Sequence, residues 1–405
     1  MRVVGMMSGT SYDAIDAAAA DLAPDGDTLV LTPLGMISTA YEDGLRAELA
    51  GALPPAATDL ATVCRLDTHI GRAFAATAVR ADLELCDGRT DLTASHGQTV
   101  YHWAESGRVY GTLQIGEPAW IAEATGRPVV SGFRTRDVAA GGQGAPLVSV
   151  FDVMWLRGRP GVPVALNLGG IANVTVIADG PGGAPLAFDT GPANALIDAA
   201  VRELADGGDP GGARSMDVDG MLAARGTVHP GLLRTLLDEP YYALPAPKTT
   251  GKELFHLPYL RAALDTCGPL PAEDVVATLT RLTARTVADA VRPFGATEVI
   301  ASGGGTRNPV LMRWLREELG GGGAGVPLRT SDELGLPSGT KEAYAFAVLG
   351  WLTAHGLPAT LPSCTGARHP SVLGSITPGG AGRSLPAPLT TAPDRLVVRA
   401  PRTLR

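Results

Sequence analysis

The 405-residue chain is poor in charged residues, aromatic residues and cysteine, and it has no apolar run long enough to span a bilayer. Charged residues make up 18% of the chain and apolar residues 45%, a balance that excludes disorder and predicts a globular core. The formal net charge of −8 argues against nucleic acid or an anionic membrane as the main partner. The four cysteines have no CxxC spacing and the N-terminus has no signal-peptide layout, so we expect a protein of the reducing cytoplasm.

A pattern of strand, turn, strand, turn and strand occurs twice in the chain. Small residues fill the first turn of each copy, as Ser8-Gly9-Thr10-Ser11 and as Gly169-Gly170. With this length, the repetition predicts two domains of one topology, and two unrelated meanders are the alternative. The predicted strands are residues 2–7, 13–22 and 28–37 in the first copy, and residues 164–168, 171–178 and 186–188 in the second.

Asp189 follows the last of these strands. The next residues, Thr190-Gly191-Pro192, are predicted to open a helix, so Asp189 is expected between a strand end and a helix start. Anionic ligands bind at such junctions in α/β sheets because backbone N–H groups and the helix dipole attract them. The sequence therefore predicts either a held phosphate or an ionised carboxylate here.

Other polar residues lie next to predicted elements. His96 and His102 follow a predicted strand at residues 92–95, but no third ligand stands at a useful spacing, so we predict sugar contacts and not zinc. Residues 132–146 are predicted to be a loop that carries Arg134 and Asp137, with an exposed connection as the alternative.

The last third of the chain adds one glycine-rich turn and one acidic helix start. Gly303-Gly304-Gly305 follows a predicted strand at residues 298–301, and Asn308 stands where a dinucleotide motif has its third glycine. Glu342 lies in the first turn of a predicted helix at residues 341–352, which the helix dipole alone could explain. Residues 375–405, rich in Pro, Gly and Arg, are predicted to be a loosely attached tail.

Three small-residue turns at strand ends resemble the plan of the actin-like ATPase superfamily, which includes sugar kinases. The resemblance implies an α/β fold of two actin-like (ribonuclease H-like) lobes around a central nucleotide cleft. It divides the chain into residues 1–131 with about 363–381, residues 132–362, and a Pro/Arg-rich tail at residues 382–405.

The chain resembles one family of that superfamily more closely, the anhydro-N-acetylmuramic acid kinases. The resemblance covers roughly residues 3 to 380. Its blocks are GMMSGTS at Gly5, HGQT at His96, TLQIGEPAWIAEATG at Thr112, AAGGQGAPL at Ala139, NLGGIANVT at Asn167, DTGPAN at Asp189, KTTGKELF at Lys248, GGGTRNP at Gly303 and KEAYAFA at Lys341.

The family resemblance implies a coupled reaction. ATP, with Mg²⁺ on its phosphates, phosphorylates the 6-oxygen of 1,6-anhydro-N-acetylmuramic acid, and water opens the anhydro ring at C1. Asp189 is implied as the base that deprotonates this water. The resemblance also implies a homodimer.

The resemblance assigns further residues to the ligands. The first phosphate hairpin spans Gly9 to Asp16, with Asp13 or Asp16 near the metal, and no metal site is expected from protein ligands alone. The nucleotide contacts are Gly9, Thr10, Ser11, Tyr12, Asp13, Ala14, Ile15, Asp16, Gly169, Gly170, Asn173, Gly303, Gly304, Gly305 and Asn308. The candidate sugar contacts are His96, Gln98, Arg134, Asp137 and Glu342.

Several positions depart from the family pattern. Gly132 stands where the family usually has Asp, and Ala193 stands in place of a glycine, so its backbone must tolerate a Cβ atom. Tyr12 and Ala14 replace the usual Leu and Gly. The alternatives are another sugar or carboxylate kinase, a non-metabolic actin-like ATPase, and a dehydrogenase that binds a dinucleotide at Gly303–Gly305.

Overall fold

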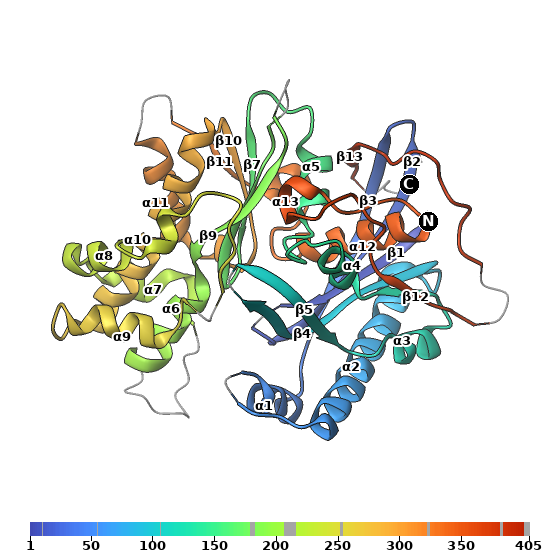
Figure 1. Cartoon of the computed structure of the whole chain (residues 1–405), viewed down its shortest axis with the longest axis horizontal. Helices are drawn as coiled ribbons and strands as arrows, with labels where there is room; N and C mark the ends of the chain where they lie inside the picture. The colour runs from blue at the N-terminus through green and yellow to red at the C-terminus, as the bar shows by residue number, and fades with distance from the viewer. Residues whose placement is uncertain are drawn as a thin grey trace. The chain divides into compact units, whose positions relative to one another are not determined.

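The computed structural model describes residues 1–9, 11–54, 56–105, 107–178, 183–205, 216–251, 254–321, 325–380 and 384–400. The chain divides into two compact units, Met1–Arg157 with Thr340–Arg405, and Gly158–Gly339. Each unit is a mixed α/β structure built around its own sheet (Figure 1). Among the described residues, no helix has the length and apolar character needed to cross a membrane.

The sheet of the first unit has the order β12-β6-β4-β1-β2-β3-β13, and β5 pairs with β4. Its strands are β1 (Arg2–Ser8), β2 (Ala14–Asp25), β3 (Thr28–Ala40), β4 (Leu92–Glu105), β5 (Arg108–Ile115), β6 (Val129–Ser131), β12 (Ser375–Thr377) and β13 (Arg395–Val398). The helices of this unit are α1 (Asp43–Ala52), α2 (Leu60–Cys86), α3 (Pro118–Thr125), α4 (Phe133–Ala139), α5 (Ser149–Leu156), α12 (Lys341–Ala354) and α13 (Pro362–Thr365).

The sheet of the second unit has the order β11-β10-β7-β8-β9. Its strands are β7 (Pro163–Leu168), β8 (Ile171–Val176), β9 (Leu186–Pro192), β10 (Glu298–Ser302) and β11 (Leu328–Thr330). The α-helices are α6 (Asn194–Ala200), α7 (Met221–Arg225), α8 (Pro230–Leu237), α9 (Leu257–Asp265), α10 (Ala272–Val291) and α11 (Pro309–Gly320). Shorter helical segments are η1 (Val201–Ala205), η2 (Val218–Gly220), η3 (Pro240–Ala243), η4 (Arg292–Phe294), η5 (Gly304–Arg307) and η6 (Ser331–Leu334).

The two units share one strand topology. In the first unit β2 is antiparallel to β1 and β3, while β4 is parallel to β1 and β6 is parallel to β4. In the second unit β8 is antiparallel to β7 and β9, while β10 is parallel to β7 and β11 is parallel to β10. The orders β6-β4-β1-β2-β3 and β11-β10-β7-β8-β9 therefore correspond strand for strand. The predicted repeat is confirmed, and with it the actin-like, ribonuclease H-like fold class.

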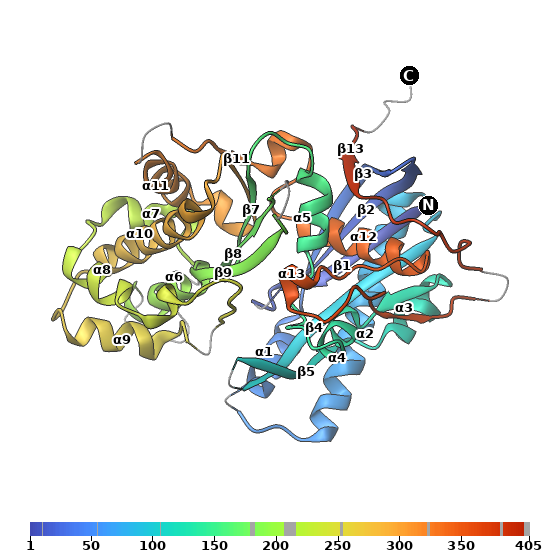
Figure 2. The ribbon, with the colours of Figure 1, turned by 45° about the horizontal axis from the view of Figure 1, so that its top comes forward.

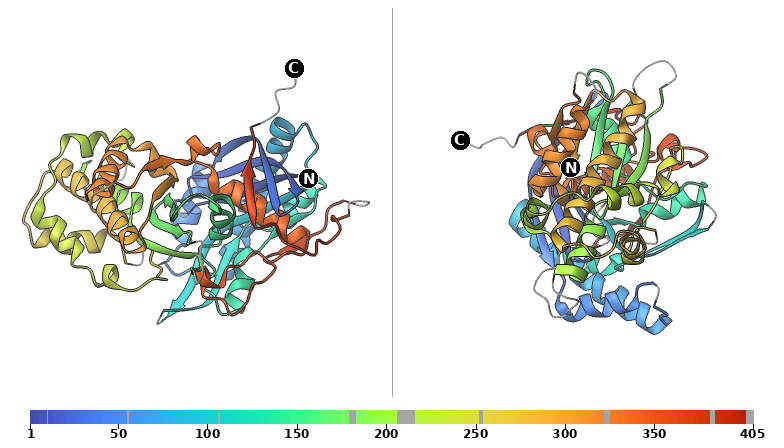
Figure 3. Two further views of the ribbon diagram at one scale, coloured as in Figure 1. Left: turned by 90° about the horizontal axis from the view of Figure 1, so that it is seen from above. Right: turned by 90° about the vertical axis from the view of Figure 1, so that its left-hand side faces the viewer.

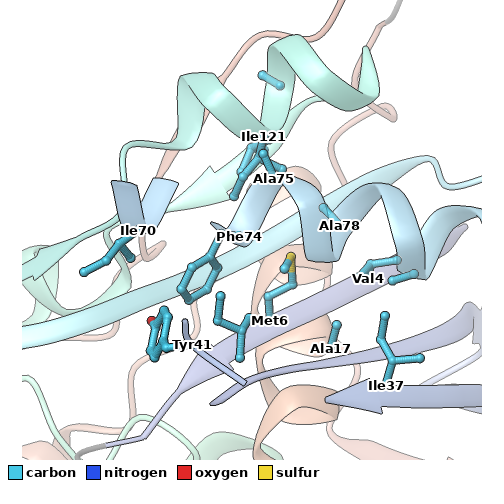
Figure 4. Close-up of a cluster of buried hydrophobic side chains, with 14 of the residues drawn as sticks. Val4, Met6, Ala17, Ile37, Tyr41, Ile70, Phe74, Ala75, Ala78 and Ile121 are labelled. Carbon is cyan, nitrogen blue, oxygen red and sulfur yellow. The ribbon is translucent and has the colours of Figure 1, made fainter. Parts of the chain in front are cut away.

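The core of the first unit lies on both faces of its sheet. On one face, Phe74 and Ile70 of α2 pack against Met6 and Val4 of β1 (Figure 4). On the other face α12 comes close to β1 at Gly5, where a Cβ atom would lie 2.0 Å from the backbone oxygen of Ala343. Only glycine permits this approach. This close contact between Gly5 and α12 fixes the start of α12 relative to the β1–β2 hairpin.

Helix α10 carries two cores in the second unit. Val287 and Ala284 face the sheet and α11, whereas Val276 and Leu279 face α6, α7, α8 and α9. Figure 3 shows these green and yellow helices grouped beside α10. The apolar residues of α10 thus recur around the helix, because it is buried on more than one side.

The end of the chain differs from the predicted loose tail. Strand β13 pairs in parallel with β3 at the edge of the first sheet (Figure 2), and Leu396 is buried there. Leu396 and Val398 alternate over too few residues, in a Pro-rich context, to predict a strand. Pairing with β3 makes this segment a strand.

The compact units also differ from the predicted division of the chain. Residues 132–157 and 340–362 belong to the first unit, because α4 packs on β5, α5 on β13, and α12 on β1 and β2. Residues 132–146, predicted to be a loop, include α4. Gly132 starts this helix with φ of 67°, a left-handed conformation that suits glycine.

Candidate functional site

The first glycine turn joins β1 to β2. The carbonyl oxygen of Gly9 accepts from the Tyr12 N–H at 3.1 Å and from Gln98 Nε2 at 3.2 Å. The side chain of Gln98 therefore anchors the turn to β4. A Cβ atom on Gly9 would meet nothing nearer than the Ser11 hydroxyl at 3.8 Å among the described residues. The turn therefore leaves space that a phosphate can occupy. Thr10 lies outside the described residues.

Residues after this turn differ in what they can offer. Asp13 forms an exposed ion pair with Arg46 at 2.6 Å. Ile15 belongs to the core that faces α2, so its side chain cannot contact a nucleotide, and Ala14 accepts a bond from the Ser8 hydroxyl. Strand alternation places Asp16 on the opposite face of the sheet from Ile15. Asp16 is thus the carboxylate of this hairpin that faces the side of α12.

Five residues of the first unit form one hydrogen-bonded chain. Arg134 Nε donates to His96 Nε2 at 2.9 Å, and Arg134 Nη1 donates to the Gly144 carbonyl at 3.2 Å. The Gly144 N–H donates to Asp137 Oδ2 at 2.7 Å, and the Thr365 hydroxyl donates to Asp137 Oδ1 at 2.7 Å. Two predicted sugar contacts, His96 and Arg134, are therefore brought together.

His96 is held as a neutral acceptor in this chain. Its Nδ1 lies 3.0 Å from the Gly97 carbonyl and carries the proton, because Nε2 accepts from Arg134. Burial first, and then the Arg134 charge, lower the pKa of His96 to about 3. The neutral imidazole orients the guanidinium and does not titrate near neutral pH.

Asp137 does not have the surroundings of a direct sugar contact. Its side chain is 0% exposed, and both carboxylate oxygens accept hydrogen bonds from within the first unit. Burial raises the pKa of Asp137, an effect opposed by the bonds from Thr365 and Gly144. This geometry indicates a structural link and differs from the predicted role.

The first turn of α12 adds charged groups to the same unit. Lys341 Nζ lies 2.6 Å from Asp152 Oδ1 of α5, and the two side chains are 2% and 7% exposed. Burial raises the pKa of the neighbouring Glu342, while Lys341 and Arg134 lower it, and Asp16 contributes a smaller opposite effect. Glu342 is therefore within electrostatic range of both Arg134 and Asp16, as expected for one site.

In the second unit, polar residues form a row across the sheet. Asn167 of β7 is the register partner of Asn173 of β8, which is in turn the partner of Asp189 of β9. Register partners present their side chains on the same face of a sheet, so these three groups form one polar strip. Asn167 was missed as a site residue, although it opens the NLGG block.

The predicted local structure around Asp189 was wrong. Strand β9 continues through Pro192, and α6 begins at Asn194, so Asp189 lies inside a strand. The first N–H groups of α6 are also engaged, because Asn194 and Ala195 donate to the carbonyls of Gly169 and Gly170. The helix dipole therefore does not explain the carboxylate.

A later segment holds Asp189 instead. The Thr250 N–H donates to Asp189 Oδ2 at 2.9 Å, and the Asp189 N–H donates to the Lys248 carbonyl at 2.9 Å. The Tyr241 hydroxyl donates to the Asp189 carbonyl at 2.8 Å. Lys248 Nζ in turn donates to the carbonyls of Tyr241 and Tyr242. Sequence reasoning missed these residues as site residues, and the KTTGKELF block was the available signal.

The remaining glycines test whether the second unit fits a nucleotide. A Cβ atom on Gly169 would lie 3.5 Å from the carbonyl oxygen of Ile171, and one on Gly304 would lie 3.6 Å from Arg307, so both would make only ordinary van der Waals contacts. A Cβ atom on Gly303 or Gly305 would instead lie within 2.8 Å of Asn167 or Leu168. The first pair fits a turn that a ligand approaches, and the second pair is explained by packing.

Two further positions have clear structural roles. Asn308 caps α11, with its Oδ1 accepting from the N–H groups of Val310 and Leu311. Ala193, in place of the family's glycine, precedes α6 with φ of −129° and ψ of −121°, outside both the extended and the helical regions. In the described part of the chain, no group of three or more His, Cys, Asp and Glu side chains is arranged to hold a metal ion.

Comparison with known proteins gives the family. The family model for anhydro-N-acetylmuramic acid kinase matches residues 1–379. A Streptomyces avermitilis anhydro-N-acetylmuramic acid kinase is 71% identical over 98% of this chain and 100% of its own length. A Rhodococcus erythropolis protein of the same name is 61% identical over 100% of this chain and 99% of its own length. Among solved structures, component A of the Acidaminococcus fermentans (R)-2-hydroxyglutaryl-CoA dehydratase has 14% identity and a TM-score of 0.43, covering 87% of this chain and 98% of that one. The extent and identity of the sequence matches establish that the chain belongs to the anhydro-N-acetylmuramic acid kinase family.

Proposed function

We propose that the chain is a kinase that converts 1,6-anhydro-N-acetylmuramic acid, ATP and water into N-acetylmuramic acid 6-phosphate and ADP. The observation that carries the proposal is the Asp189 carboxylate, which the Thr250 N–H orients and which pairs in register with Asn173 on the hairpin of the Gly169-Gly170 turn. Family membership supplies the substrate class. The reaction places the protein in peptidoglycan recycling, in the cytoplasm where ATP is available.

The chemistry needs one base. Asp189 accepts a proton from water, and the water oxygen forms a bond to C1 of the sugar as the bond from C1 to the 6-oxygen breaks. The 6-oxygen bonds to the γ-phosphorus, and the bridging oxygen leaves with ADP. Because the γ-phosphoryl group captures the departing oxygen, no separate acid is required, unlike in an inverting glycosidase.

The rest of the machinery positions charge. The Gly9 and Gly169 turns offer backbone N–H groups to phosphates, and Gly303 to Gly305 would lie near adenosine. Mg²⁺, when bound, would neutralise phosphate charge, and Asp16 has the hard oxygen donor that this ion prefers. Arg134 and Glu342 would contact the sugar, and His96 would orient Arg134. Gln98 supports the Gly9 turn. The family resemblance further predicts a homodimer, which sedimentation velocity tests.

Turnover in heavy-oxygen water tests the proposed reaction. We expect one heavy oxygen on C1 of the sugar phosphate and none in the phosphoryl group, by mass analysis of rapidly quenched product. A control with finished product in the same water measures exchange at C1. Heavy oxygen in the phosphate, or a phosphorylated sugar with its ring intact, would overturn the proposal.

A further inference from the structure

Asp137 is a buried carboxylate that the proposed reaction does not use. It is 0% exposed, and its two oxygens accept bonds of 2.7 Å from Thr365 and from the N–H of Gly144. A buried carboxylate is costly to desolvate, and one whose oxygens both accept short hydrogen bonds makes the groups that donate to it rigid. The element held here is the backbone at Gly144.

The backbone of Gly144 links Asp137 to Arg134. Its N–H donates to Asp137 Oδ2, and its carbonyl oxygen accepts from Arg134 Nη1 at 3.2 Å. The N–H and the carbonyl of Gly144 belong to two successive peptide groups that meet at its Cα atom, so the bond from Asp137 constrains the carbonyl through the φ and ψ angles of this one residue. His96 holds a second point of the same guanidinium through Arg134 Nε at 2.9 Å. Two supports on different atoms set both the position and the plane of the group.

The loop between α4 and α5 is shaped to permit this arrangement. A Cβ atom on Gly142 would lie 2.3 Å from Asp137 Oδ2, so only glycine leaves the carboxylate in place. Gly144 has φ of 68°, a left-handed conformation that turns its peptide toward α4. Both glycines therefore serve the same contact from independent directions.

We propose that Asp137 is a positioning residue that holds Arg134, through the backbone of Gly144, in the orientation in which Arg134 contacts the sugar. The inference rests on the proposed function, because it assumes that Arg134 contacts the sugar substrate. It replaces the expected direct contact of Asp137 with an indirect one. Disturbing Asp137 should then weaken binding of the sugar equally in the ground state and in the transition state.

Steady-state kinetics compare four variants. Asp137→Ala and Gly142→Ala should each raise KM for the sugar by about tenfold to hundredfold, the effect of losing one hydrogen bond to a charged group, with KM for ATP unchanged. Asp137→Asn should keep KM for the sugar near the wild-type value, because its amide oxygen can accept from the Gly144 N–H and its amide N–H can donate to the Thr365 hydroxyl. Thr365→Val, the matched control, removes the bond to the other carboxylate oxygen and should lower Tm while leaving KM for the sugar within about twofold.

A double-variant cycle separates positioning from general stability. In an Arg134→Ala background, Asp137→Ala should raise KM for the sugar no further, because the two residues act through one contact. Additive effects of the two substitutions would overturn the proposal. So would a rise in KM for Thr365→Val equal to that of Gly142→Ala.

A spectroscopic readout is independent of the reaction. In protein with ¹⁵N-labelled Arg and His, the N–H···N bond from Arg134 to His96 should give a coupling across the hydrogen bond. The coupling should weaken in Gly142→Ala and persist in Thr365→Val. An unchanged coupling in Gly142→Ala would overturn the proposal even if the chain acts on another substrate. Failure of the wild type to phosphorylate the anhydro sugar would instead count against the proposed function alone.

Discussion

Asp189→Asn is the most direct perturbation of the proposed chemistry. The Thr250 N–H that now donates to Asp189 Oδ2 at 2.9 Å can donate equally to an amide oxygen. The backbone bonds from Tyr241 and to Lys248 are unaffected by the change of side chain. The fold and ATP binding should therefore persist, whereas an amide cannot accept a proton from water. Loss of a general base lowers the rate by about 10²–10⁴.

The assay follows ring opening and phosphorylation separately, by heavy-oxygen incorporation and by ADP release. Both should fall together, because the 6-oxygen becomes a nucleophile only as its bond to C1 breaks. Tyr241→Phe is the control: it removes the hydroxyl that donates to the Asp189 carbonyl, and should reduce stability by about 1 kcal/mol while leaving the rate within a few-fold. Turnover of Asp189→Asn close to wild type would falsify the base assignment. A variant that phosphorylates without opening the ring would refute the coupling.

Four further predictions concern stability and ligand binding. Lys341→Met should destabilise the protein by about 3–5 kcal/mol in urea unfolding, because it leaves Asp152 charged and buried, and adding Asp152→Leu should recover much of the loss. The pKa of His96 is about 3 when folded and about 6.5 when unfolded, so the unfolded state binds more protons between these values. His96 should therefore lower the free energy of unfolding by about 1.4 kcal/mol for each pH unit below 6.5. Urea unfolding between pH 6.5 and 5 should show this pH dependence in the wild type and not in His96→Gln. Gly169→Ala should raise KM for ATP with little change in Tm, whereas Gly303→Ala should destabilise by about 1–3 kcal/mol because its Cβ atom meets Asn167 and Leu168 at 2.6 and 2.7 Å. Truncation before Asp394 removes β13 and the buried Leu396, and should cost about 2–5 kcal/mol and promote aggregation, measured by thermal unfolding and light scattering.

The repeated topology could be predicted from the sequence because it depends on local signals. Short β-rich runs separated by small-residue turns specify hairpins, and the same signals occur at residues 8–11 and 169–170. The strand β13 was missed because a short Pro-flanked run is stabilised by its neighbour β3 and not by its own pattern.

The error at Asp189 has a specific cause. Thr190-Gly191-Pro192 has the composition of a helix start, with Pro near the first turn. Pairing with β8 extends the strand, since Pro192 is the register partner of Ile171 and Gly191 that of Ala172. Tertiary pairing thus overrides the local signal, as it commonly does at the ends of elements.

Contacts between distant residues were beyond prediction for a different reason. Thr250 is 61 residues from Asp189, and Lys341 is 189 residues from Asp152. No periodicity or spacing in the sequence predicts such a pair, because each partner is an ordinary polar residue within its own segment. The Asp137 link is of the same kind: the sequence places Asp137 near Arg134, and only the fold shows that the Gly144 backbone connects them.

The glycine turns show how a correct motif can hide two different causes. Gly169 and Gly303 belong to equally recognisable motifs, and each invites the same explanation of close approach to a nucleotide. In the structure, Gly303 is required by the atoms of Asn167 and Leu168, so its identity would be explained with no ligand at all. No described atom requires Gly169 or Gly9 in this way, because a Cβ atom would meet nothing nearer than 3.5 Å at Gly169 and 3.8 Å at Gly9. A glycine that the protein itself does not need is the stronger evidence for a ligand, and by that reasoning the two hairpin turns carry more weight for phosphate binding than the glycine-rich turn after β10.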